Sequence, residues 1–300
     1  RCFHGPGRCL VITCCGAPYS TETIMENNNS LVWADSACAT FRYCELAAEQ
    51  KTPVHNGWQT NTKSFDEVWD AHQANRSNIG LLLGNTSGLM DIDCDSLEAV
   101  ALMHHLADGY LGHFKRSHDS AHYLFLCKGG GKTVRLAHPD GGVIVELRGD
   151  GSQTMVPPST HPDGQQLSVK DWHPDASHHH YDSLYQLLHR VGALALLMQG
   201  WHVGSRHQLS LSFAGLCQSL GISYDDAYEM VQLLCHVTYD DEENARLNNV
   251  RLTYHRPTAS NIGFTGLCEV IDKASADKVS DWLCKAYGLR PTGTQVTVSS

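Results

Sequence analysis

The chain has 300 residues, of which 42% are hydrophobic and 18% are charged. This is enough for one large domain or two ordinary ones, each with its own core. A net charge of −10 argues against strong, unspecific binding of nucleic acid over a wide surface, although it leaves room for a local basic groove. No apolar run approaches the ~20 residues that cross a bilayer, so we expect no membrane contact.

The two ends of the chain lack the regular pattern of apolar residues that the rest shows. Residues 1–34 are irregular, and the pattern becomes orderly only after Met25, where we expect the native protein to begin. Residues 291–300 are set aside as a tail. None of the 12 cysteines forms a Cys-x-x-Cys pair, which disfavours a zinc ribbon or finger and predicts free thiols in a reducing, cytoplasmic compartment.

The first half of the chain mixes the periods of helix and strand. Ser64 can cap a helix over residues 64–74, and a glycine-bounded apolar run predicts a buried strand over residues 78–84. Alternation predicts a strand over Leu89–Cys94, followed by a helix over residues 96–107. Further strands are predicted over 121–127, 143–148 and 153–156.

The second half shows helical spacing. Helices are predicted over residues 181–198, 206–220, 224–237 and 278–286. We therefore expect an α+β fold with a mixed α/β domain over residues 35–175 and a small all-helical domain over residues 181–290, joined by the histidine-rich stretch 171–180.

Three carboxylates stand out in the predicted strands. Asp91 and Asp93 are two residues apart, so they project from one face of their strand, and their mutual repulsion is relieved if a cation binds them. Glu146 lies mid-strand among apolar neighbours and also needs a partner. Such oxygen ligands suit Mg²⁺ or Mn²⁺. Solvated acids on an open sheet face would give the same spacing.

Basic residues near these acids are candidates for phosphate contacts. His122 opens the strand 121–127 and can donate a hydrogen bond to a phosphate, and Arg148 shares the strand face of Glu146. Lys128, Lys132 and Arg135 surround a glycine loop.

Five motifs in this order resemble the primase–polymerase domain of the archaeo-eukaryotic primase superfamily, which is found in replication proteins of plasmids, phages and mobile elements. The motifs are Ser77-Asn-Ile-Gly-Leu-Leu-Leu-Gly, Ser87-Gly-Leu-Met-Asp-Ile-Asp, Ser120-Ala-His, Val145-Glu-Leu-Arg-Gly-Asp-Gly and Val156-Pro-Pro-Ser-Thr-His-Pro-Asp-Gly. The resemblance covers about half of the chain. The following helices are similar to the helical unit of such primases, in which Arg206 is a candidate template contact.

The resemblance implies a sheet-lined catalytic cleft and a template-dependent DNA primase/polymerase. Asp91, Asp93 and Glu146 would bind Mg²⁺ or Mn²⁺, and Ser120, His122 and Arg148 would bind the nucleoside triphosphate. The implied partners are a single-stranded DNA template and a replicative helicase, fused or separate. The chain departs from the family in having Glu146 where Asp is usual, and Ser-His-Asp-Ser-Ala where many relatives have Ser-Gly-Gly before the histidine.

Two other functions remain compatible with the sequence. One is a catalytically silent nucleic-acid-binding module of a replication initiator, which would have no need of three metal-ready acids. The other is a metal-dependent nuclease, which uses similar carboxylates but does not need His122 for a triphosphate.

Overall fold

The computed structural model describes residues 40–117 and 119–289, so the expected start at Met25 and the tail 291–300 lie outside it. In chain order the strands and helices are β1 (Tyr43–Leu46), α1 (Phe65–Asn75), β2 (Asn78–Leu82), β3 (Leu89–Cys94), α2 (Leu97–Leu106), β4 (Gly112–Ser117), β5 (Ser120–Cys127), β6 (Val134–Ala137), β7 (Val143–Arg148), β8 (Gln153–Val156), β9 (Ser168–Trp172), β10 (His178–His179), α3 (Tyr181–Gly200), α4 (Arg206–Leu220), α5 (Tyr224–Val237), α6 (Glu243–Tyr254), α7 (Gly263–Val270) and α8 (Lys273–Ala286).

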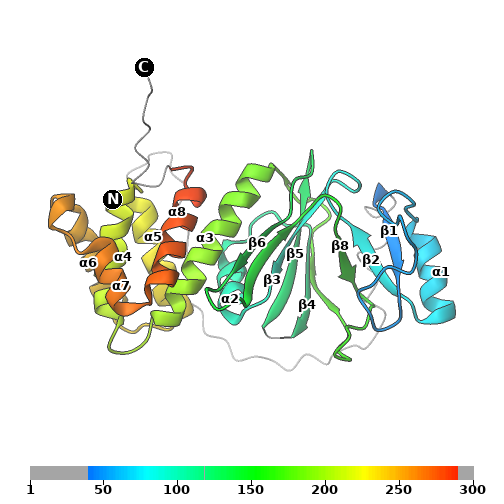
Figure 1. Cartoon of the computed structure of the whole chain (residues 1–300), viewed down its shortest axis with the longest axis horizontal. Coiled ribbons are helices and arrows are strands. Elements are labelled where there is room, and N and C mark those ends of the chain that lie inside the picture. Colours follow the sequence, from blue (N-terminus) through cyan, green and yellow to red (C-terminus); the bar gives the residue numbers. More distant parts are fainter. Residues whose placement is uncertain (1–39, 118, 290–300) are drawn as a thin grey trace, which may run out of the picture.

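Two sheets organise the first part of the described chain. The larger has seven strands, with β6-β7-β3-β5-β4-β9 paired antiparallel in this order and β10 added parallel to β5. The smaller sheet, β1-β2-β8, lies beside it and carries α1 (Figure 1). Strand β3 lies between β5 and β7, and all six of its residues are buried. The predicted α+β class is confirmed for this part of the chain.

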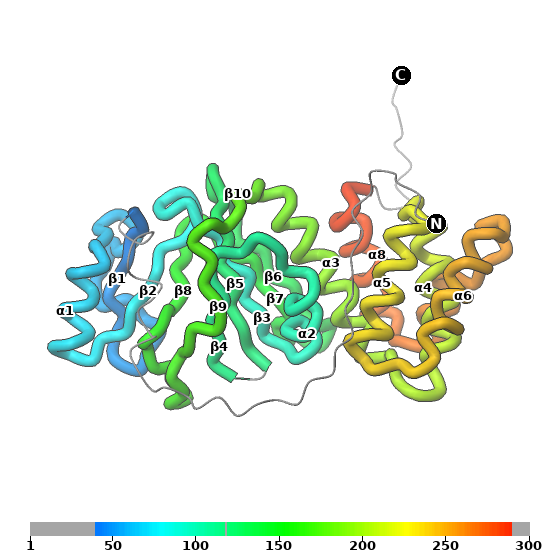
Figure 2. Tube along the Cα trace, turned by 180° about the vertical axis from the view of Figure 1, so that it is seen from behind, coloured from blue at the N-terminus to red at the C-terminus, as the bar shows by residue number. Residues whose placement is uncertain are grey.

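The helices that follow gather at the end of the molecule opposite the small sheet, as both views show (Figures 1 and 2). Helix α3 packs on α8, α4 packs on α6 and α7, and α5 packs on α6. Helices α2 and α3 also contact the large sheet through β7. None of the helices in residues 40–117 and 119–289 is both long and apolar enough to cross a membrane.

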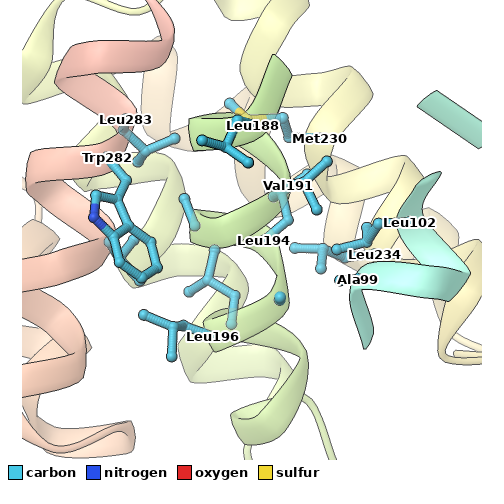
Figure 3. Packing of buried hydrophobic residues seen from close by; sticks show 14 of the residues in the cluster. Ala99, Leu102, Leu188, Val191, Leu194, Leu196, Met230, Leu234, Trp282 and Leu283 are labelled. Carbon is cyan, nitrogen blue, oxygen red and sulfur yellow. The ribbon is translucent and has the colours of Figure 1, made fainter. Parts of the chain in front are cut away.

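One hydrophobic cluster joins the sheet to the helices. Helix α3 is apolar around most of its circumference, which is typical of a buried helix. Figure 3 shows Val191 and Leu194 of α3 between Trp282 of α8 and Leu234 of α5, with Leu102 of α2 beyond. The same cluster continues into β3, β5 and β7, so α3 belongs to the core of both parts.

The predicted bounds of several elements are confirmed to the residue, among them Leu89–Cys94 and Arg206–Leu220. Helix α8 begins five residues earlier than predicted because Asp272 caps it by accepting a hydrogen bond from the backbone N–H of Ser275. The stretch 171–180 is ordered: its first two residues end β9, and His178–His179 pairs with β5.

Replacing Ser64 with alanine should lower the free energy of unfolding by about 1 kcal/mol. Ser64 caps α1 by accepting from the Glu67 N–H, and the Glu67 carboxylate accepts from the Ser64 N–H. Chemical denaturation measures the change. The Ser64→Asp variant keeps a capping oxygen and should remain near the wild-type stability; an equal loss in both variants would contradict the capping argument.

Candidate active site

The register of three neighbouring strands brings the predicted site residues together. Asp93 of β3 lies directly opposite His122 of β5 on one side and Glu146 of β7 on the other. Asp91 lies opposite Arg148 of β7. Directly paired residues in antiparallel strands project from the same sheet face. The five side chains therefore share one face at the centre of the large sheet.

The Nδ1 of His122 hydrogen-bonds Asp91 and forms a longer ion pair, without a hydrogen bond, with Asp93. This nitrogen lies 2.9 Å from Asp91 Oδ2 and 3.5 Å from Asp93 Oδ1. Burial alone would lower the pKa of His122, but the charges of Asp93 and Asp91 outweigh it and raise that pKa to about 9. His122 is therefore an imidazolium at neutral pH, and it offsets part of the repulsion between the aspartates.

Glu146 pairs with two arginines. Arg135 Nη2 lies 3.1 Å from Glu146 Oε1, and Arg148 Nε lies 3.9 Å from Glu146 Oε2. Arg148 also reaches Asp93, with Nη1 at 3.6 Å from Oδ2. Two arginines thus neutralise the charge of Glu146. Its assignment as a metal ligand stays a prediction.

Two buried carboxylate oxygens remain without a hydrogen-bond partner, Asp91 Oδ1 and Asp93 Oδ1. Leaving a buried acceptor unpaired costs about 1–3 kcal/mol, and more for a charged group, so the pair fits a hard cation. No group of three or more His, Cys, Asp or Glu side chains within residues 40–117 and 119–289 is arranged to hold a metal ion. The two unpaired oxygens of the aspartates are available to a divalent cation, and Glu146 as a third ligand stays a prediction.

A pocket of about 210 Å³ opens beside these residues. Asp93, His122 and Arg148 line it on the large sheet, and β8 of the small sheet lines it with Gln153 and Met155. The predicted Ser120 also lines it. The nucleotide-binding residues expected from the sequence thus meet at one cavity between the two sheets.

Asp95 is a further acidic residue of the pocket that sequence reasoning missed. Burial is the main reason that its pKa rises to about 6, and the charge of Asp93 adds to the rise. The signal was present in the sequence, since Asp91, Asp93 and Asp95 are spaced two residues apart.

A basic group on the pocket wall was missed as well. Arg116 of β4 contacts His161, with Nη1 2.8 Å from Nε2, and lies 3.4 Å from Asp163 Oδ2. The Arg116 Nε–H is buried and has no hydrogen-bond acceptor. Lys51 lines the same cavity. Three cationic or imidazole groups therefore extend the site beyond His122 and Arg148.

The remaining predicted phosphate contacts lie elsewhere. Lys128 and Lys132 are exposed in the glycine loop and do not line the pocket. Arg135 is held by Glu146. Arg206 of α4 lies in the helical part, 3.4 Å from the buried carboxylate of Asp240, beside a separate cavity of about 460 Å³.

Comparison with known families agrees with this arrangement. Residues 34–178 match the model of the family described as bifunctional DNA primase/polymerase, N-terminal. The match spans just under half of the chain and includes every strand that carries the candidate site. No curated protein matches the chain.

We call residues 34–178 the Prim-Pol region. It ends at β10, so the helices from α3 onward lie outside it. The family match supports DNA primase/polymerase activity for this region.

Proposed function

We propose that the chain is a template-dependent nucleotidyltransferase that joins nucleotides on single-stranded DNA. The observation that carries the proposal is the cross-strand cluster of Asp91, Asp93, His122 and Arg148 within the Prim-Pol region. The last three of these line one pocket, and Asp91 is buried behind them. In the reaction, a 3′-hydroxyl attacks the α-phosphate of a nucleoside triphosphate; the bond from this oxygen to phosphorus forms, and the bond to the pyrophosphate oxygen breaks.

Asp91 and Asp93 are the residues that would hold Mg²⁺ or Mn²⁺, because their unpartnered oxygens are hard anionic ligands. A divalent cation bound there would stabilise negative charge on the phosphoryl group and favour ionisation of the attacking hydroxyl. Glu146 would join these ligands only by giving up its arginine partners.

The side chains of the pocket would hold the triphosphate. Nδ1 of His122 is engaged by the aspartates, which leaves its Nε2–H to donate to a phosphate oxygen. Arg148 and Arg116 add guanidinium donors, which match phosphate oxygens in geometry and charge. The pocket thus combines carboxylates that can bind a cation with cationic donors that can bind phosphates.

The direct test is an incorporation assay with the full chain, single-stranded DNA, labelled nucleotides and either Mg²⁺ or Mn²⁺, with and without an annealed primer. We expect labelled product that depends on template and on the cation. Reactions that lack template or contain a chelator are the controls. Absence of product under all these conditions would favour a catalytically silent nucleic-acid-binding module, to which the arginine pairing of Glu146 lends some support.

The cellular setting is part of the proposal. Resemblance alone supports a replication system of a plasmid, phage or mobile element, and a replicative helicase as partner. A cytoplasmic location is supported by the cysteines of the described residues, all seven of which are free thiols.

Replacing His122 with glutamine should raise the apparent KM for the nucleotide by about ten-fold or more, because a charged hydrogen bond to the triphosphate is lost. Steady-state kinetics with varied nucleotide measures it. The matched control is His179→Gln in β10, outside the pocket. An unchanged KM in the His122 variant would remove this residue from the triphosphate site.

A further inference from the structure

A further pocket, of about 290 Å³, lies on the opposite face of the large sheet. Its floor includes Lys115 of β4 and Tyr123 of β5, whose sequence neighbours Arg116 and His122 line the candidate active site. Successive residues of a strand project to opposite faces. The sheet therefore separates the two pockets, and α2 and the end of α5 form the walls of the further one.

Four histidines and one lysine line this pocket. His104 and His105 of α2, His113 of β4 and His236 of α5 line it together with Lys115, and none of the described lining residues is acidic. The ring of His105 lies 4.8 Å from that of His236 and 5.3 Å from that of His104, between centroids. His113 already pairs through Nδ1 with Asp171 at 3.1 Å, so Lys115 and the other imidazoles are the groups open to a ligand.

Tyr239 stands at this pocket with 91% of its surface exposed. It directly follows the C-cap of α5 and has φ 52°, a left-handed conformation that favours glycine. The N–H of Asp240 closes the helix end on the Cys235 carbonyl at 2.8 Å. Glycine at position 239 would therefore adopt this backbone conformation with less strain than tyrosine. The exposed ring of Tyr239 contributes almost nothing to the hydrophobic core.

An uncovered aromatic ring beside a lysine and imidazole N–H donors suits a ligand that has both a planar base and a phosphate. Imidazoles also bind transition metals, but the described residues hold no group of three or more side chains arranged for an ion. We propose that this pocket is a second, non-catalytic site for a nucleoside phosphate, whose base stacks on Tyr239 while Lys115 and the imidazoles receive its phosphate. The inference does not depend on the catalytic proposal.

The test is equilibrium binding to the full chain of two probes: ATP labelled with a fluorophore on its ribose, and a fluorophore-labelled single-stranded oligothymidylate. The Tyr239→Gly and Lys115→Ala variants should each raise the dissociation constant of at least one probe at this pocket by about ten-fold. Stacking of a base on an aromatic ring contributes binding free energy on this scale. The melting temperature of the Tyr239→Gly variant should not fall, because glycine suits this backbone conformation.

The matched control is Lys170→Ala, which removes the same charge from the exposed strand β9 outside the pocket and should leave binding unchanged. Loss confined to labelled ATP identifies a free nucleotide as the ligand, and loss confined to the oligonucleotide identifies a nucleotide within a strand; either supports the site. Unchanged binding of both probes in both variants would overturn it. A failed catalytic proposal would show instead as absent incorporation while the Tyr239-dependent site persists.

Discussion

Replacing both Asp91 and Asp93 with asparagine should lower the rate of nucleotide incorporation by about 10³-fold or more. The neutral amides cannot neutralise a divalent cation, and half of each side chain presents N–H donors where an oxygen ligand is required. Single-turnover incorporation at saturating nucleotide and Mn²⁺ measures the effect on the chemical step. Full activity in this double variant would leave the catalytic proposal without its basis.

The fold should tolerate this change. Asparagine has almost the volume of aspartate, so β3 keeps its packing between β5 and β7, and circular dichroism should remain that of the wild type. The matched control is the double variant Asp171→Asn and Asp175→Asn, which removes the same charge outside the pocket and should keep full incorporation. Loss of activity in that control would trace the effect to net charge.

Replacing Asp240 with asparagine should lower the free energy of unfolding by about 3 kcal/mol, because the buried guanidinium of Arg246 then keeps only the largely exposed carboxylate of Glu242 as its counterion. The carboxylate of Asp240 is fully buried. It accepts from Arg246 Nε at 3.0 Å and from Trp201 Nε1 at 3.1 Å, and lies 3.4 Å from Arg206 Nη1. Urea denaturation at neutral pH measures the loss.

An exposed ion pair provides the control. Asp277 pairs with Lys273 on the surface of α8, and Asp277→Asn should change the free energy of unfolding by about 0–1 kcal/mol. Equal losses in both variants would show that burial of Asp240 is not the cause.

The effect of Asp240 should depend on pH in a defined direction. Burial would raise its pKa, but hydrogen bonds from the Glu242 N–H, Arg246 and Trp201, together with the charge of Arg246, outweigh this and lower the pKa below the ordinary value of 3.8. The contribution to stability is therefore fully present above that value and is lost as the pH falls through the lower, folded-state pKa. The difference between wild type and Asp240→Asn should be constant near neutrality and shrink only in acid.

Elements with a clear apolar period were predictable from the sequence. The alternation in Leu89–Cys94 and the 3.6-residue period of α5 gave their bounds directly. Strand β4, Gly112–Ser117, carries alternating polar residues that become strand only by pairing with β5 and β9. Helix α6 is mostly polar and is held by α4 and α5, so its own pattern carries little signal.

The candidate site was predictable in its residues but not in its pairings. Strand alternation put Asp91 and Asp93 on one face, yet only the observed register shows that His122 and Glu146 flank Asp93. The pairing of Glu146 with Arg135 could not be predicted from the sequence, because it depends on β6 lying beside β7. Arg116 was missed because the strand that carries it, β4, was not predicted from the sequence.

The core shared by sheet and helices sets a limit on how this chain can be divided. The family match stops at residue 178, yet α3 begins at Tyr181 and packs on β6 and β7, where Gly192 lies so close to Leu136 that an added β-carbon would stand 2.6 Å from it. A fragment that ends with the match would leave that side of the sheet in water and prone to aggregate. A chimaera in which a different helical domain replaces the helices of this chain would fold only if it kept α3 together with the strands that α3 covers.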